Sequence, residues 1–271
     1  STLFPYTTLF RSLEKGDYLF LERFLDSTKA NMFFAKGILL VEGDAENLLI
    51  PTIAEVIGYP LSKYGISIVN VGSTAFLRYS RIYQRISNPD LEIPVAVITD
   101  LDIRPDIYKK IDSSSKTESD FDLGIELKKK VDRYDGKGVK TFISPKWTLE
   151  YAIASSENFR WMLLKAIICA KKEGNNNSFI LDSEKLGEIQ ETVQKVKEEF
   201  EKKGLSNSEI AWELYYGYLL NKQISKAITA QWFAYIIQNK SKEVKQLLLE
   251  DENVKYLIEA IKYVTGGNIA T

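Results

Sequence analysis

The sequence predicts an α/β fold: a mostly parallel, Rossmann-like sheet flanked by helices, followed by an all-helical appendage. Residues 37–41, 66–71 and 95–99 are short, largely apolar runs, which are typical of strands buried on both faces of a parallel sheet. Segments with apolar residues at helical spacing separate these runs. From about Trp147 onward the pattern is helical throughout.

The composition is that of a globular protein. With 271 residues, 45% hydrophobic and 27% charged, the chain can bury the core of one large domain or of one domain with a helical appendage. The formal net charge of −1 gives no overall basic field, so any nucleic-acid binding has to rely on local patches. The sequence has no apolar run near the roughly 18 residues of a membrane span and no signal-peptide pattern, so we expect a cytoplasmic protein.

The chain contains no histidine and a single cysteine, Cys169. Ser-His-Asp and Cys-His catalysis and zinc sites built on imidazole or thiolate are therefore excluded. Cys169 lies in an apolar helical pattern, where buried packing is expected. Carboxylate oxygen is what remains for metal chemistry, and it suits Mg²⁺, Mn²⁺ or Ca²⁺.

Acidic residues follow the first predicted strand. The run 37–41 ends at Glu42, a glycine turn follows, and Asp44 can cap a helix over 44–57 that carries Glu46 in its first turn. Ligands bind at this edge of an open α/β sheet, so the two glutamates indicate a cation site. The alternative is an acidic first helical turn that only complements the helix dipole.

A second acidic pair, Asp100 and Asp102, follows the strand 95–99. Residues two apart in a strand point to one face about 7 Å apart, so both can address one cation or a close pair. The two pairs converge only if their strands are neighbours, and a divalent ion would then relieve their repulsion. Glu150, after a predicted strand 139–144, is a fifth carboxylate candidate.

Four other residues are weaker candidates. Ser73 lies in a small-residue turn after the second strand, and Arg78 shares a helical face with two further arginines that could grip phosphates or simply be solvated. Thr148 could bind a ligand or phosphate, although capping is its more common role. Lys226 begins a helix and is, physically, an ordinary lysine.

The remaining elements follow from apolar spacing. Residues 104–122 are expected to form a flexible surface excursion beside the site. Helices are expected at 17–34, 75–86, 123–134, 184–203, 207–221, 225–238 and 241–264.

This order of elements and acids resembles a Toprim domain, and most closely the OLD-family (overcoming lysogenization defect) nucleases, which include the nuclease half of ATPase-nuclease phage-defence proteins. The resemblance spans about residues 18–240. It is carried by Phe24-Leu-Asp with Lys29-Ala-Asn-Met-Phe-Phe-Ala35, Leu40-Val-Glu-Gly-Asp-Ala-Glu46, Asn70-Val-Gly-Ser73, Ile98-Thr-Asp-Leu-Asp102, Trp147-Thr-Leu-Glu150, and Ser225-Lys-Ala with Ala230-Gln231.

The resemblance implies a metal-dependent DNA endonuclease that follows an ABC-type ATPase domain. Lys226 would meet the scissile phosphate, and one ion would activate a water while another stabilises the leaving oxygen. The metal ligands implied, for one or two Mg²⁺ or Mn²⁺ ions, are Glu42, Glu46, Asp100, Asp102 and Glu150, with Glu42 and Asp100 also catalytic.

The same resemblance implies three regions: a lead-in over 1–35, a Toprim domain over 36–155 and a helical region over 156–271. Two departures stand out. Ala152 occupies a position where another acid is expected, and no Gly-x-x-x-x-Gly-Lys-Ser/Thr phosphate loop is present, so the chain is expected to be a fragment or a stand-alone nuclease domain. A homodimer is one candidate assembly.

Two other functions compete with the nuclease. Asp100-Leu-Asp102 after an apolar strand also resembles haloacid-dehalogenase-type phosphatases, in which the first aspartate is phosphorylated, but Arg104 stands where that motif needs Thr or Val. A non-catalytic Toprim-like module that binds DNA or a partner protein is the third possibility.

Overall fold

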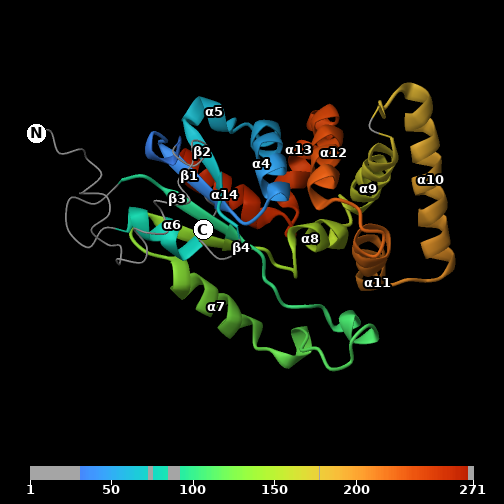
Figure 1. The fold of residues 1–271 in the computed structure, drawn as a ribbon, viewed down its shortest axis with the longest axis horizontal. Helices are drawn as coiled ribbons and strands as arrows, with labels where there is room; N and C mark the ends of the chain where they lie inside the picture. Colours follow the sequence, from blue (N-terminus) through green and yellow to red (C-terminus); the bar gives the residue numbers. More distant parts are fainter. Residues whose placement is uncertain (1–30, 73–75, 85–91, 177, 268–271) are drawn as a thin grey trace, which may run out of the picture.

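The computed structural model describes residues 31–72, 76–84, 92–176 and 178–267 (Figure 1). Four strands form one parallel sheet in the order β2-β1-β3-β4. The strands are β1 (Gly37–Val41), β2 (Ile66–Asn70), β3 (Val95–Thr99) and β4 (Val139–Ile143). The predicted parallel α/β sheet is thus confirmed, and β1 and β3 are buried along their whole length.

Helices flank the sheet and continue after it. The segments η1, η2 and η3 are 3-10 helices, and η4 is a π-helix. In chain order they are η1 (Asn31–Phe33), α4 (Asp44–Ile57), α5 (Leu61–Tyr64), α6 (Phe76–Tyr83), η2 (Asp106–Lys110), η3 (Glu118–Asp120), α7 (Leu123–Tyr134), α8 (Leu149–Ser155), α9 (Arg160–Asn175), α10 (Ser183–Lys202), α11 (Asn207–Trp212), η4 (Glu213–Leu220), α12 (Lys226–Asn239), α13 (Ser241–Glu250) and α14 (Lys255–Thr265).

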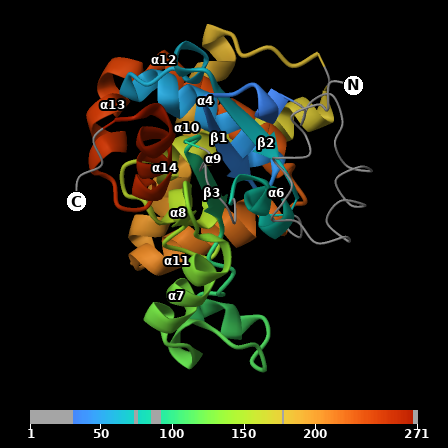
Figure 2. The same ribbon diagram turned by 90° about the vertical axis from the view of Figure 1, so that its left-hand side faces the viewer.

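The sheet is covered on both faces. Alternate residues of β1 point to opposite sides: Leu39 and Val41 join the large core formed with α4, α8 and the later helices, whereas Ile38 and Leu40 join a smaller core with η1 and α6. The last helix, α14, returns to pack on β1, β3 and β4, and α12 packs along α4 (Figures 1 and 2). The helical region therefore completes the core over the sheet.

Strand order brings two carboxyl ends together. The chain places β2 on one side of β1 and then crosses to place β3 on the other side, so the direction of winding reverses between β1 and β3. Ile38 is in register with Val95 and Leu40 with Val97. The first residues after these two strands therefore meet at a topological switch point, where open α/β sheets bind ligands.

Two helix predictions in the C-terminal region need correction. The helix expected over 241–264 is two helices, because the chain turns at Asp251, whose carboxylate accepts hydrogen bonds from Ser156 Oγ (2.5 Å) and Asn158 Nδ2 (2.9 Å). The helix expected over 207–221 changes from α-helix to π-helix at Glu213. The helix expected over 17–34 lies almost entirely outside the described residues.

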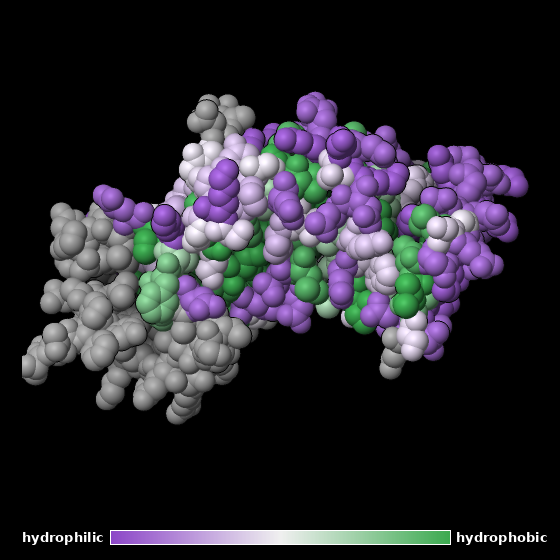
Figure 3. Space-filling model, turned by 90° about the horizontal axis from the view of Figure 1, so that it is seen from above, coloured by the Kyte–Doolittle hydropathy of each residue, from purple (hydrophilic) through white to green (hydrophobic). Residues whose placement is uncertain are grey.

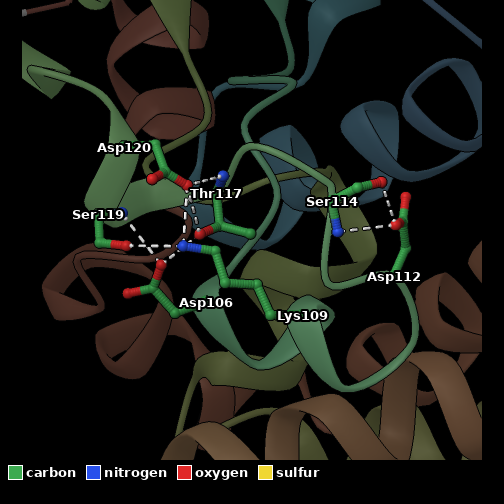
Figure 4. A network of polar contacts seen from close by, with 7 residues as sticks. All are labelled: Asp106, Lys109, Asp112, Ser114, Thr117, Ser119 and Asp120. Atoms are coloured by element: carbon green, nitrogen blue, oxygen red, sulfur yellow. Dashed lines mark hydrogen bonds and ion pairs between the residues drawn. The ribbon is translucent and has the colours of Figure 1, made fainter.

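The excursion over 104–122 is held by its own polar network, contrary to the flexible segment expected (Figure 4). Asp106 accepts hydrogen bonds from the buried Thr117 hydroxyl (2.5 Å) and the Ser119 amide (3.0 Å), and Lys109 pairs with Asp120 (2.9 Å). The Thr117 hydroxyl is the main cause of lowering the pKa of Asp106 to about 2. Together with α7, this segment extends away from the body (Figure 2).

At the end of the molecule formed by α10, the surface side chains are mostly hydrophilic in the view from above (Figure 3). Buried Cys169 lies in α9, as predicted. Among the helices of the described residues, none is long and apolar enough to cross a membrane.

Replacing Asp106 by Ala should loosen the excursion, because the Thr117 hydroxyl and the Ser119 amide lose their shared acceptor. We expect faster hydrogen–deuterium exchange over 105–121, with protection of the sheet unchanged. Asp132→Asn, at an exposed position on α7, is the control. Equal exchange in the wild type and Asp106→Ala would show that the network does not order this segment.

Candidate functional site

A pocket of about 320 Å³ lies at the switch point between β1 and β3. Four segments far apart in the sequence contribute to it: the turn after β1, the residue after β3, the start of α8 and the start of α12. Its lining residues are Glu42, Gly43, Asp44, Ala45, Glu46, Asp100, Glu150, Lys226 and Ala227.

The turn after β1 supplies three acids. Gly43, and not Asp44 as predicted, is the N-cap of α4, with extended backbone. A Cβ at Gly43 would meet Glu46 Oε2 at 3.2 Å, so glycine lets Glu46 fold back over the turn. Glu42 accepts a hydrogen bond from Thr99 of β3 (3.3 Å), and Asp44 accepts one from Asn70 at the end of β2 (2.7 Å).

The two aspartates after β3 diverge. Because β3 ends at Thr99, the strand geometry expected for Asp100 and Asp102 does not apply. Asp100 enters the pocket and accepts a hydrogen bond from the Leu149 amide (2.9 Å). Asp102 adopts a left-handed backbone (φ 63°) and pairs outside the pocket with Lys130 (2.5 Å). From the sequence, both side chains were expected to address one cation or a close pair. In this structure they point to different places, one into the pocket and the other to Lys130.

Glu150 and Lys226 complete the charged lining of the pocket. Thr148 caps α8 by accepting a hydrogen bond from the Tyr151 amide, and its hydroxyl donates to Glu150 Oε2 (3.0 Å). The same oxygen accepts a hydrogen bond from Lys226 Nζ (2.8 Å), at the first turn of α12. Glu150 is 5% exposed, whereas the Lys226 side chain is 41% exposed, so the lysine reaches from solvent into the pocket.

The pocket has an excess of negative charge. Burial, followed by repulsion from Glu150 and Glu42, raises the pKa of Glu46 to about 7. Burial and the neighbouring glutamates raise the pKa of Asp100 well above its usual range. Burial, the largest single influence, opposes the charge on Lys226, but the anionic surroundings, with Glu150 foremost, together outweigh it and raise the lysine pKa. One ammonium thus faces several carboxylates that resist ionising together.

Residues 33–102 match the family described as "Overcoming lysogenization defect protein-like, TOPRIM domain". These residues form an OLD-like Toprim domain. They include β1, α4, β2 and β3, and hence Glu42, Glu46 and Asp100. In OLD proteins the Toprim domain is the nuclease-bearing region.

Solved structures with a similar arrangement include C-terminal regions of two OLD proteins. The one from Xanthomonas campestris pv. campestris, phased with platinum, is 21% identical with a TM-score of 0.47, over 87% of this chain and 95% of that one. The one from Burkholderia pseudomallei is 21% identical with a TM-score of 0.44, over 86% of this chain and 100% of that one. No curated protein sequence matches the chain.

Toprim domains generally depend on a divalent metal. Among the described residues, no group of three or more Asp, Glu, Cys or His side chains is arranged to hold a metal ion as it stands. The donor chemistry nevertheless fits a hard cation, because the ligands on offer are all carboxylate oxygens and two of those carboxyls have raised pKa values. In the metal-free pocket, Lys226 provides the positive charge that faces these carboxylates. A bound divalent ion would add to it.

The other predicted residues lie elsewhere. Ser73 is outside the described residues, and Arg78, on α6, does not line the pocket. Asp44 also lines the pocket but was not predicted to do so from the sequence, although its position two residues after Glu42 could have indicated it. Lys130, which donates to the Asp100 carbonyl (2.6 Å), carried no signal in the sequence because α7 is remote from the motifs.

The raised pKa of Glu46 predicts how the metal-free Toprim domain responds to pH. Glu46 binds its proton more tightly in the folded protein than in the unfolded chain. The free energy of unfolding therefore falls as the pH rises from the unfolded pKa of this group, about 4.5, to its folded pKa, about 7. In EDTA, Glu46→Gln should therefore melt at a higher temperature than the wild type at pH 8, and the difference should disappear near pH 4.

Glu191→Gln, at an exposed position on α10, is the matched control and should leave the melting temperature unchanged. Equal melting of Glu46→Gln and the wild type at pH 8 would contradict the raised pKa.

Proposed function

We propose that the chain is a metal-dependent DNA endonuclease, the nuclease part of an ATPase-nuclease phage-defence protein. The observation that supports it most is the shared pocket of Glu42, Glu46, Asp100 and Glu150 beside one lysine, at the switch point of an OLD-like Toprim sheet. Phosphodiester hydrolysis suits this set of residues because it needs no histidine when a metal is present.

The residues proposed to hold one or two Mg²⁺ or Mn²⁺ ions are four of the five pocket carboxylates, Glu42, Glu46, Asp100 and Glu150. Asp102 could join them only after its pair with Lys130 opens. When bound, the metal would activate water and offset negative charge on the phosphate. Binding of the ion would displace the protons of these carboxyls into solvent, which links metal affinity to pH.

Lys226 is proposed to stabilise the transition state. Its ammonium faces the carboxylates on one side and solvent on the other, so a phosphate entering the pocket would come within its reach. The raised pKa keeps the amine charged at neutral pH. A fixed positive charge beside the scissile phosphate would be worth most as charge builds on its oxygens.

DNA would contact the rim of the pocket through local charge, since the net charge is only −1. Ser73 and Arg78 remain proposed DNA contacts, and Thr148 is proposed to act through Glu150. An ATPase domain or subunit is proposed as partner because residues 33–102 match the OLD-like Toprim family, whose ATPase-nuclease members carry an ATPase domain. A homodimer remains one candidate assembly.

Incubating the chain with supercoiled plasmid and Mg²⁺ or Mn²⁺ tests the proposal. We expect Asp100→Asn to lose at least about 100-fold in cleavage rate and Lys226→Ala about 100- to 1,000-fold, because each removes a charge used in the transition state. EDTA should abolish cleavage. Asp132→Asn is the control for preparation and folding.

Unchanged cutting by Asp100→Asn would place the activity at another site or in a contaminant. A wild type that does not cut, but traps an aspartyl-phosphate on Asp100, would indicate the phosphatase. Binding of DNA without added metal and without cleavage would indicate the non-catalytic module.

A further inference from the structure

Lys130 ties the projecting helix α7 to the edge of the proposed metal site. Its ammonium donates one hydrogen bond to the backbone carbonyl of Asp100 (2.6 Å) and a second to the carboxylate of Asp102 (2.5 Å). The Lys130 side chain is 24% exposed, so most of it is shielded from solvent. Two oxygens from the turn that follows β3 thus converge on one positive charge.

The donor atoms of this contact are those that suit a metal ion. A backbone carbonyl and a carboxylate are oxygen ligands of the kind that hard divalent cations bind. Asp102 is one of the two aspartates predicted from the sequence to address a cation, and its side chain is 60% exposed, so ions in solution can reach it. The ammonium of Lys130 therefore occupies a carboxylate that a divalent ion in the neighbouring pocket would attract.

The backbone of this turn has supports other than Lys130. The Asp100 carboxylate accepts a hydrogen bond from the Leu149 amide (2.9 Å), and the Asp102 amide donates one to the Trp147 carbonyl (3.1 Å). Asp102 has a left-handed backbone (φ 63°), which aspartate adopts more readily than most residues. Loss of the ammonium should therefore free the Asp102 side chain without displacing Asp100 from the pocket.

The strength of the ion pair allows a metal to break it. Ion pairs with an exposed partner contribute little to stability, and Asp102 is such a partner. A divalent ion carries twice the charge of the ammonium, so at equal distance it attracts the carboxylate more strongly. Because Asp102 is turned away from the pocket, its carboxylate has to leave Lys130 to reach an ion there.

We propose that Lys130 is a positioning residue that competes with the divalent metal for Asp102. In the metal-free protein its ammonium holds this carboxylate outside the pocket, and a metal ion gains Asp102 as a ligand only by displacing the lysine. The inference rests on the metal site of the proposed nuclease function. Because the two events are linked, Lys130 lowers the affinity of the site for metal, and metal binding releases the tie between α7 and the pocket.

Titration of the metal-free chain with Mn²⁺, followed by the electron paramagnetic resonance signal of free Mn²⁺, tests the competition without DNA. The titration is run in about 0.3 M KCl, which screens remote charges. Lys130→Met keeps an unbranched stem and removes the charge, so we expect Mn²⁺ to bind about 10-fold more tightly than to the wild type. Adding Asp102→Asn should abolish this gain, because the freed carboxylate is its source.

Lys129→Met is the matched control. Lys129 lies on the same helix, but it is 65% exposed and pairs with Glu126 within α7, so this variant should bind Mn²⁺ as the wild type does.

Acetylation of Lys130 gives a second readout, which uses the wild type and does not depend on how Lys130→Met folds. If the metal displaces the ammonium, saturating Mn²⁺ should make Lys130 several-fold more reactive relative to Lys129, as mass spectrometry can measure. In Asp102→Asn the lysine has already lost its ionic partner, so Mn²⁺ should change its reactivity little.

Three results would each overturn the competition: equal Mn²⁺ affinity in the wild type and Lys130→Met, a gain that persists in the double variant, or Lys130 reactivity that Mn²⁺ does not alter. Failure of both the wild type and Lys130→Met to bind Mn²⁺ would overturn it as well. A chain that shows the competition but does not cleave DNA would contradict the nuclease proposal alone.

Discussion

Parallel pairing of β1 with β3 is the constraint on which the site depends. It sets Glu42 beside Thr99 and brings Asp100 next to the turn that carries Glu46, so acids that are more than fifty positions apart share one small volume. Bringing carboxylates together in a poorly solvated place costs free energy, which is visible as raised pKa values. The fold tolerates this cost because the two central strands, β1 and β3, are buried along their whole length.

The positive side of the site comes from a different kind of contact. Lys226 reaches the pocket because α12 packs along α4, the helix that begins beside the acidic turn. Its ammonium donates a hydrogen bond to Glu150 and lies 5.5 Å from the centre of the Tyr215 ring. Sheet topology thus gathers the acids, whereas helix packing supplies their counter-charge, and the two meet only in the complete tertiary structure.

This division explains what could be predicted from the sequence. Buried parallel strands are apolar runs, so each strand end was visible, and Glu42, Asp100 and Glu150 were found because they follow strands. Asp102 shows the limit of that reasoning: once the chain leaves β3, a left-handed residue turns its carboxylate to Lys130. The proximity of Tyr215 to Lys226 could not be predicted, because nothing in a local pattern tells which buried tyrosine lies beside a lysine.

The return of α14 to the sheet also bears on how the chain is made. Leu39 and Val41 belong to the first described strand, whereas the helix that packs on β1 is the last described element. During synthesis on the ribosome that apolar face has no complete cover until α14 emerges. The nascent chain is therefore exposed to aggregation while the segment between β1 and α14 is being made, and its folding rate depends on contacts between distant segments.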